Sequence, residues 1–93
     1  MIIEFDKSFE KSLDKIKNKS IFPRIEKIIL EFEKSKSLTD LPNIKKLTGF
    51  KNYYRLRIGE YRLGFEKIDE NTVRVILIAH RKDIFKLFPR QYH

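Results

Sequence analysis

The sequence has no cysteine and no tryptophan, and it has only three glycines and three prolines. Without cysteine there is no disulfide framework, no thiolate nucleophile and no cysteine-ligated metal site. No apolar run approaches the roughly 20 residues that span a bilayer, and the first residues lack the pattern of a signal peptide. Glycine-rich phosphate loops, paired metal carboxylates and Ser/His/Asp motifs are also missing. We therefore expect a cytoplasmic protein with no membrane association, no metal and no cofactor.

What the sequence does have is an excess of positive charge. Lysine and arginine total 21 against 13 acidic residues, which gives a net charge of +8. Such an excess favours a polyanionic partner, namely a nucleic acid, a ribosome or an acidic protein, over a surface that is merely solvated. The hydrophobic fraction of 41% over 93 residues is typical of a globular chain with one modest core. We expect one domain over residues 1–93.

The first half of the sequence has helical periodicity. A short strand is expected at 2–5, followed by a helix that Asp6 caps, with apolar residues recurring at i, i+4 and i+7. Ser20 is the expected N-cap of a second helix, which ends near Lys36. The tight connection between the two predicts an antiparallel helical hairpin.

In the second half the apolar period changes to two. Glycine at the first position of the turn Gly59-Glu60 favours a type II′ hairpin. The run at 72–79 is apolar at nearly every residue, which predicts an interior strand. Strands and a short C-terminal helix are expected at 44–47, 53–58, 61–68, 72–79 and within 82–88. The order β-α-α-β-β-β with a short C-terminal helix predicts an α+β fold, in which an antiparallel meander packs on the N-terminal helical hairpin.

The hairpin register places several arginines on one face of this sheet. It pairs Arg57 with Arg62 and Arg55 with Gly64, while the apolar residues of both strands face the helices. Directly opposed arginines repel each other, so an anion is expected between them. On the same face, Gly64 leaves a gap for a ligand and Tyr53 offers a ring for base stacking. The alternative is a solvent face whose arginines pair with the glutamates at 60 and 66.

Further candidates follow the interior strand. His80, Arg81 and Lys82 emerge at its end, where His80 either moves protons or is a partly buried strand residue. Phe85 and Phe88 recur at helical spacing, which favours packing over base stacking. Three lysines flank the same region and are candidate phosphate contacts: Lys45, Lys46 and Lys51.

Three segments together resemble the RelE/ParE toxin superfamily, and most of all its archaeal-type RelE branch. They are Lys46-Leu47-Thr48-Gly49, the hairpin from Tyr54 to Leu63, and the run from Ala79 to Phe85. The combination is specific, because it joins a basic-X-basic strand, a glycine turn with Tyr-Arg, and His-Arg-Lys after an apolar strand.

The resemblance implies a microbial-RNase-like fold and the toxin of a type II toxin–antitoxin system. It implies a ribosome-dependent endoribonuclease that cuts mRNA in the A site and inhibits translation. In such toxins the RNA 2′-hydroxyl attacks the adjacent phosphate without a metal. By position, Arg55, Arg57, Arg62 and Arg81 would bind and polarise the scissile phosphate, while Lys45, Lys46, Lys51, Tyr53, His80, Lys82 and Phe85 would contact RNA.

The resemblance leaves the proton transfer open. Many RelE toxins carry a C-terminal tyrosine near Phe85, which keeps the stacking ring but lacks the hydroxyl, and Tyr92 is seven residues further on. Arginine keeps its proton at ordinary pH and is no general base. Glu66, His80, a tyrosine, or the RNA and its host particle are the remaining candidates.

The resemblance also implies a partner, a cognate antitoxin that covers or distorts the basic site in a toxin–antitoxin hetero-oligomer. Two alternatives stay open. One is a ParE-like poison of DNA gyrase. The other is a catalytically weak homologue that acts mainly by binding its antitoxin or operator DNA.

Overall fold

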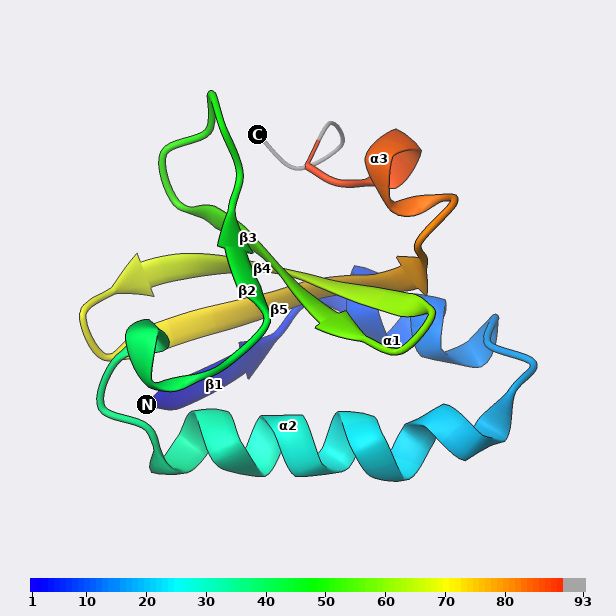
Figure 1. Ribbon diagram of the computed structural model, residues 1–93, viewed down its shortest axis with the longest axis horizontal. Coiled ribbons are helices and arrows are strands. Elements are labelled where there is room, and N and C mark those ends of the chain that lie inside the picture. The colour runs from blue at the N-terminus through cyan, green and yellow to red at the C-terminus, as the bar shows by residue number, and fades with distance from the viewer. Residues whose placement is uncertain (90–93) are drawn as a thin grey trace.

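The computed structural model describes residues 1–89 and has an α+β architecture, as the sequence predicts (Figure 1). Two short 3₁₀ turns, Lys19–Ile21 and Leu38–Asp40, precede and follow the second helix. The strands and α-helices, in chain order, are β1 (Ile2–Phe5), α1 (Lys7–Asp14), α2 (Phe22–Lys34), β2 (Ile44–Lys46), β3 (Tyr53–Ile58), β4 (Tyr61–Asp69), β5 (Thr72–His80) and α3 (Ile84–Leu87).

The described strands form one sheet in the order β1-β5-β4-β3-β2. Strands β2 to β5 make the expected antiparallel meander, and the described sheet has five strands, one more than the predicted order β-α-α-β-β-β counts. The first strand adds a feature that the sequence did not predict, because β1 pairs in parallel with β5. Since β5 is therefore paired on both sides, the prediction of an interior strand at 72–79 is confirmed.

The hairpin of β3 and β4 has the predicted register and turn. Arg57 lies opposite Arg62, and Arg55 lies opposite Gly64. Gly59 has a φ of 58°, whereas Glu60 is not among the described residues with positive φ. This combination is the one that a type II′ turn requires.

The two long helices cover one face of the sheet (Figure 1). The Asp6 side chain accepts a hydrogen bond from the Ser8 backbone N–H and caps α1 as predicted. The predicted cap at Ser20 is wrong, because the Asn18 side chain instead accepts from Ser20 N and caps the 3₁₀ turn that leads into α2. No helix within residues 1–89 is long and apolar enough to cross a membrane.

The core has two parts, one on each face of the sheet. The larger part lies under α1 and α2 and includes Phe32, Leu63 and Phe65, all fully buried. A smaller cluster lies on the opposite face, where α3 and Phe88 cover part of the sheet. Its members are Leu47, Tyr53, Ile76, Leu77, Ile84 and Phe88. A β-bulge after Gly64 turns both Ile76 and Leu77 into this second cluster.

Candidate functional site

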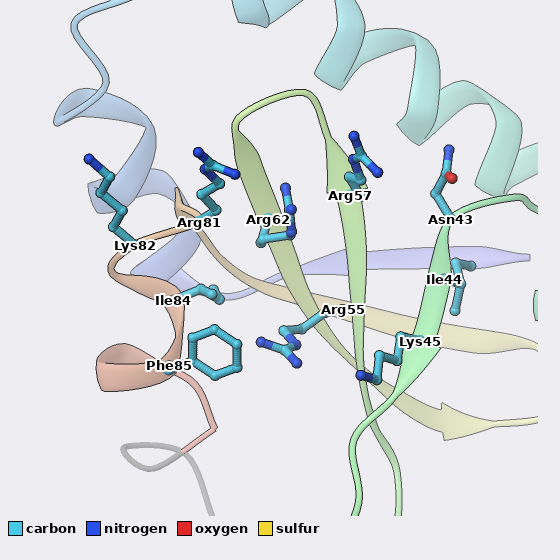
Figure 2. Close-up of a pocket in the computed structure, with 10 residues that line it drawn as sticks. All are labelled: Asn43, Ile44, Lys45, Arg55, Arg57, Arg62, Arg81, Lys82, Ile84 and Phe85. Atoms are coloured by element: carbon cyan, nitrogen blue, oxygen red, sulfur yellow. The ribbon is translucent and has the colours of Figure 1, made fainter.

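An open pocket of about 660 Å³ lies beside α3, on the face of the sheet opposite α1 and α2 (Figure 2). Six of its lining residues are cationic, and no carboxylate, histidine or tyrosine of residues 1–89 lines it. The lining consists of Asn43, Ile44, Lys45, Arg55, Arg57, Arg62, Arg81, Lys82, Ile84 and Phe85. We call it the arginine pocket.

Strand register explains why the arginines converge. Arg55 and Arg57 alternate along β3, and Arg62 faces Arg57 from β4. Arg81 directly follows β5, whose end pairs with the start of β4. Figure 2 shows Arg57, Arg62 and Arg81 side by side, with their side chains pointing to the same side.

Two of these arginines are held by their neighbours. Nη1 of Arg62 donates to the carbonyl oxygens of Gly59 and Tyr61, both at 2.9 Å. Nε of Arg81 lies 2.9 Å from a carboxylate oxygen of Glu60, and the backbone N–H of Arg81 donates to the Glu60 carbonyl oxygen at 2.8 Å. The β3–β4 turn therefore positions both guanidinium groups.

Arg55 lies deeper and stacks on an aromatic ring. Its guanidinium carbon is 4.3 Å from the centre of the Phe85 ring, which is 65% exposed. Burial lowers the pKa of Arg55 below the ordinary arginine value, and the charge of Arg62 lowers it further. Arginine stays protonated even so, and a bound anion would relieve both effects.

The charges in the arginine pocket are largely uncompensated. Among residues 1–89, no carboxylate oxygen lies within 4.0 Å of the guanidinium nitrogens of Arg55, Arg57 or Arg62. The expected alternative, in which Glu60 and Glu66 pair with these arginines, is therefore wrong. Glu60 pairs with Arg81 instead. Such an open cluster of forked donors suits a phosphate group.

The structure brings most of the predicted site residues together. The four arginines, Lys45, Lys82 and Phe85 all line the arginine pocket. Phe85 is exposed there, which corrects the expectation that it packs. Phe88 is 2% exposed and packs as expected.

Tyr53 and Gly64 do not have the expected surroundings. Both lie on the arginine face, but Tyr53 is buried with its ring edge-on to Phe88 at 5.3 Å, and this burial, with Glu66 as a smaller cause, raises the pKa of Tyr53. A Cβ on Gly64 would lie 2.7 Å from the Phe88 ring. The expectations of a stacking Tyr53 and of a gap at Gly64 are wrong, because Phe88 fills that space.

Three other predicted residues lie elsewhere. His80 pairs with Tyr61, which puts it on the opposite face from Arg62, and its Nδ1 accepts from the Lys82 backbone N–H at 3.2 Å. Lys46 pairs with Tyr54, so it also belongs to the helix-covered face. Lys51 is exposed in the loop before β3 and does not line the arginine pocket.

Glu66, the carboxylate considered as a general base, does not reach the arginine pocket either. It lies opposite Tyr53 and Arg74. Tyr92 lies outside the described residues. No group of three or more His, Asp or Glu residues within 1–89 is arranged to hold a metal ion.

Asn43 lies in the pocket wall and was not predicted there from the sequence. Its φ is 65°, a left-handed conformation that asparagine adopts more readily than most residues. Its carbonyl oxygen accepts from the backbone N–H of Arg57 at 3.1 Å, which ties the linker to β3. Asparagine after Pro42 is a turn signal that could have pointed to this position.

Known proteins are similar to this chain in both sequence and fold. Residues 3–85 match the family described as the ParE toxin of type II toxin–antitoxin system, parDE. The chain is 42% identical over 90 residues to Toxin RelE3 of Methanocaldococcus jannaschii, which covers 96% of this chain and all of the relative.

Two solved complexes extend the comparison. The chain matches the RelB–RelE antitoxin–toxin complex from Methanococcus jannaschii with a TM-score of 0.77 and 40% identity, over 92% of this chain and 99% of that one. It matches the intact E. coli RelBE toxin–antitoxin complex with a TM-score of 0.63 and 28% identity, over 85% of this chain and 94% of that one.

The fold and the arginine pocket define a small basic α+β protein of the RelE-like toxin class. The chain belongs to the ParE toxin family of type II toxin–antitoxin systems, and within it is a RelE-like toxin.

Proposed function

We propose that this toxin is an endoribonuclease that cuts mRNA on the ribosome and so inhibits translation. The observation that carries the proposal is the convergence of Arg55, Arg57, Arg62 and Arg81 on one open pocket that no carboxylate within residues 1–89 lines. A phosphodiester placed there would meet forked donors from three segments of the chain, namely β3, β4 and the turn after β5.

The proposed reaction is an internal transfer. The 2′-oxygen forms a bond to the adjacent phosphorus, the bond to the 5′-oxygen of the next nucleotide breaks, and a 2′,3′-cyclic phosphate remains. Negative charge develops on the non-bridging oxygens as this happens. Fixed guanidinium groups stabilise that charge, and loss of one such donor typically slows catalysis by about 10²–10³-fold.

The proton transfers need groups that the arginine pocket does not contain. No Asp, Glu, His or Tyr within residues 1–89 lines it, and arginine and lysine ordinarily hold their protons at neutral pH. We therefore assign to the RNA or the ribosome both the acceptor of the 2′-hydroxyl proton and the donor of a proton to the departing 5′-oxygen. This assignment gives a chemical reason for activity only on the ribosome, and we accordingly propose that the toxin acts in the cytoplasm.

Phe85 has a binding role in this proposal. Its exposed ring, which stacks on Arg55, presents its other face to a base. Lys45 and Lys82 at the pocket rim would contact the phosphates on either side. Phenylalanine has no hydroxyl, so Phe85 would orient the nucleotide without donating a proton.

We further propose a cognate antitoxin as the protein partner in a hetero-oligomer. The two solved relatives named above are complexes of RelE with RelB antitoxins. An antitoxin segment with carboxylates over the arginine pocket would neutralise its charges and exclude RNA.

The matched family is named after ParE toxins, so poisoning of DNA gyrase is the second candidate function.

The test that separates mRNA cleavage from gyrase poisoning is induction in cells of the wild type, Arg62→Ala and Arg81→Ala, with Lys51→Ala as a control outside the pocket. We expect mRNA cleavage and growth arrest for the wild type and the control, and loss of both for the arginine variants.

Two outcomes would reject the proposed function. DNA breaks and an SOS response without mRNA cleavage would identify a gyrase poison. Antitoxin binding without any toxicity would identify a catalytically weak homologue.

A further inference from the structure

A second groove, of about 920 Å³, runs along the end of β5 between α1 and α3. Figure 1 shows these two helices on either side of that strand end. Five exposed lysines line the groove, and within residues 1–89 no carboxylate oxygen lies within 4.0 Å of their Nζ atoms. They are Lys7, Lys11, Lys15, Lys17 and Lys86, and we call the site the lysine groove.

The basic and acidic residues of α1 lie on different sides of the helix. Lys7, Lys11 and Lys15 recur every four residues and face the lysine groove, whereas Glu10 and Asp14 do not line it. Like charges four residues apart on a helix repel each other and destabilise it. An anion held along this row would turn that repulsion into attraction.

The carboxylates that do line the groove leave most of its charge in place. They are Asp6 and Asp83. Asp6 accepts hydrogen bonds from the backbone N–H and the hydroxyl of Ser8, so it is already engaged as the cap of α1. The lysines therefore outnumber the acids by five to two.

The edge of β5 in this groove is closed to another strand. β1 pairs only with Thr72–Val75. Beyond it, the Ser12 hydroxyl accepts from the Ile78 backbone N–H at 3.0 Å, and the Ser8 hydroxyl lies at hydrogen-bond distance from both the Ile76 carbonyl oxygen and the Asp6 carboxylate, which share its one proton. Since α1 occupies these edge groups, a protein partner gains no strand pairing here, and the positive charge is the main recognition feature.

We propose that the lysine groove binds the phosphodiester backbone of ribosomal RNA and anchors the toxin on the ribosome; this inference rests on the proposed function. Successive lysines of the row are about 6 Å apart along the helix axis, and lysine is a point charge suited to sequence-independent phosphate contacts.

The position of the groove favours ribosomal RNA over the mRNA being cut. The turn after β5 separates the two sites, because Lys82 lines the arginine pocket while Asp83 lines the lysine groove. One RNA strand would have to bend sharply around this turn to occupy both. A second RNA chain avoids that bend.

The test compares two triple variants that remove the same charge. The groove variant removes the three positive charges along α1 and is Lys7→Gln/Lys11→Gln/Lys15→Gln. The control variant removes three lysines that do not line the groove and is Lys27→Gln/Lys34→Gln/Lys36→Gln. Glutamine and lysine have similar helix propensity, so both should fold. Affinity for mRNA-free ribosomes is measured by sedimentation over a series of salt concentrations.

We expect the groove variant to bind at least about 10-fold more weakly at low salt, with the slope of log K against log salt reduced by about 2–3. The control should keep the wild-type slope to within about 1. If thermal unfolding shows that the triple variant does not fold, each single Lys→Gln variant should reduce the slope by about 1.

Equal affinities and slopes for both triple variants would overturn the inference, as would a wild type that does not bind ribosomes. Weaker binding to a free single-stranded RNA alone would assign the groove to mRNA, and weaker binding to the antitoxin alone would assign it to an acidic protein. If the toxin cuts no mRNA but still binds ribosomes through the lysine groove, the proposed function would be rejected and the inference would be supported.

Discussion

The two faces of the sheet use the same alternation of residues for different purposes. On the helix-covered face, side chains such as Leu56, Leu63 and Phe65 are fully buried in one continuous core. The other face is divided between a small apolar cluster and the arginine pocket. The difference teaches that the helix-covered face supplies most of the stability of the fold. Because it does, the opposite face can hold arginines that have no acidic partner within residues 1–89.

Residues that follow β5 set the boundary on the second face. Phe88 covers Gly64 and Tyr53, while Phe85, three residues earlier, stays exposed over Arg55. One side of the short α3 segment thus completes the apolar cluster, and the other side lines the arginine pocket.

The largest expected effect separates stability from activity. Phe65 contacts the rings of Phe32 and Tyr54 at 5.1 Å and 5.5 Å between centroids. Phe65→Ala should reduce the free energy of unfolding by about 3–5 kcal/mol. Arg62→Ala, on the open part of the other face, should change it by less than about 1 kcal/mol. Urea denaturation of both variants checks the comparison, and equal losses would break it.

A second prediction concerns the boundary at Gly64. A Cβ there would lie 2.7 Å from the Phe88 ring, in a tightly packed cluster. Gly64→Ala should reduce the free energy of unfolding by about 1–3 kcal/mol through overpacking. In a Phe88→Leu background the same change should cost less, and a double-mutant cycle measures the difference. Additive effects would show that Phe88 does not occupy this space.

A third prediction concerns the cap of α1. Asp6→Ala should reduce the free energy of unfolding by about 1 kcal/mol at pH 7. Hydrogen bonds from Ser8 lower the pKa of Asp6 in the folded protein, so its stabilising effect is complete above the ordinary aspartate pKa of about 3.9 and is lost as the pH falls through the lowered value. Denaturation series at pH 7 and at acid pH should therefore show the gap between the two proteins shrinking on acidification.

The smallest expected effect has the opposite sign. Arg57→Gln removes one of two directly opposed arginines. It should raise the free energy of unfolding by a few tenths of a kcal/mol at low salt, and the gain should vanish at high salt, where surface repulsion is screened. Urea denaturation at two ionic strengths measures it. Destabilisation at low salt would mean that Arg57 has a structural role.

The hairpin could be predicted because its turn is local. Gly59 specifies the turn, and the turn fixes the register that opposes Arg57 and Arg62. Helix boundaries were harder to predict, since Asn18 and Ser20 are both good capping residues, and the structure uses Asn18 to cap the 3₁₀ turn before α2.

Long-range pairings could not be predicted in the same way. Nothing in residues 2–5 identifies β5, some 70 positions later, as a parallel partner. Alternation correctly placed Tyr53 on the arginine face, but its burial depends on Phe88, which is distant in sequence. His80 adjoins Arg81, and strand pairing with Tyr61 nevertheless takes it to the other face.

The most direct test of the central claim is the rate of mRNA cleavage by purified toxin on ribosomes that carry a defined mRNA. The variants are Arg55→Ala, Arg62→Ala and Arg81→Ala, with Arg74→Ala as a matched control, because Arg74 pairs with Glu4 away from the pocket. We predict cleavage by the wild type and the control, and rates about 10²–10³-fold lower for the pocket variants. No cleavage by the wild type, or equal rates for all four variants, would contradict the account.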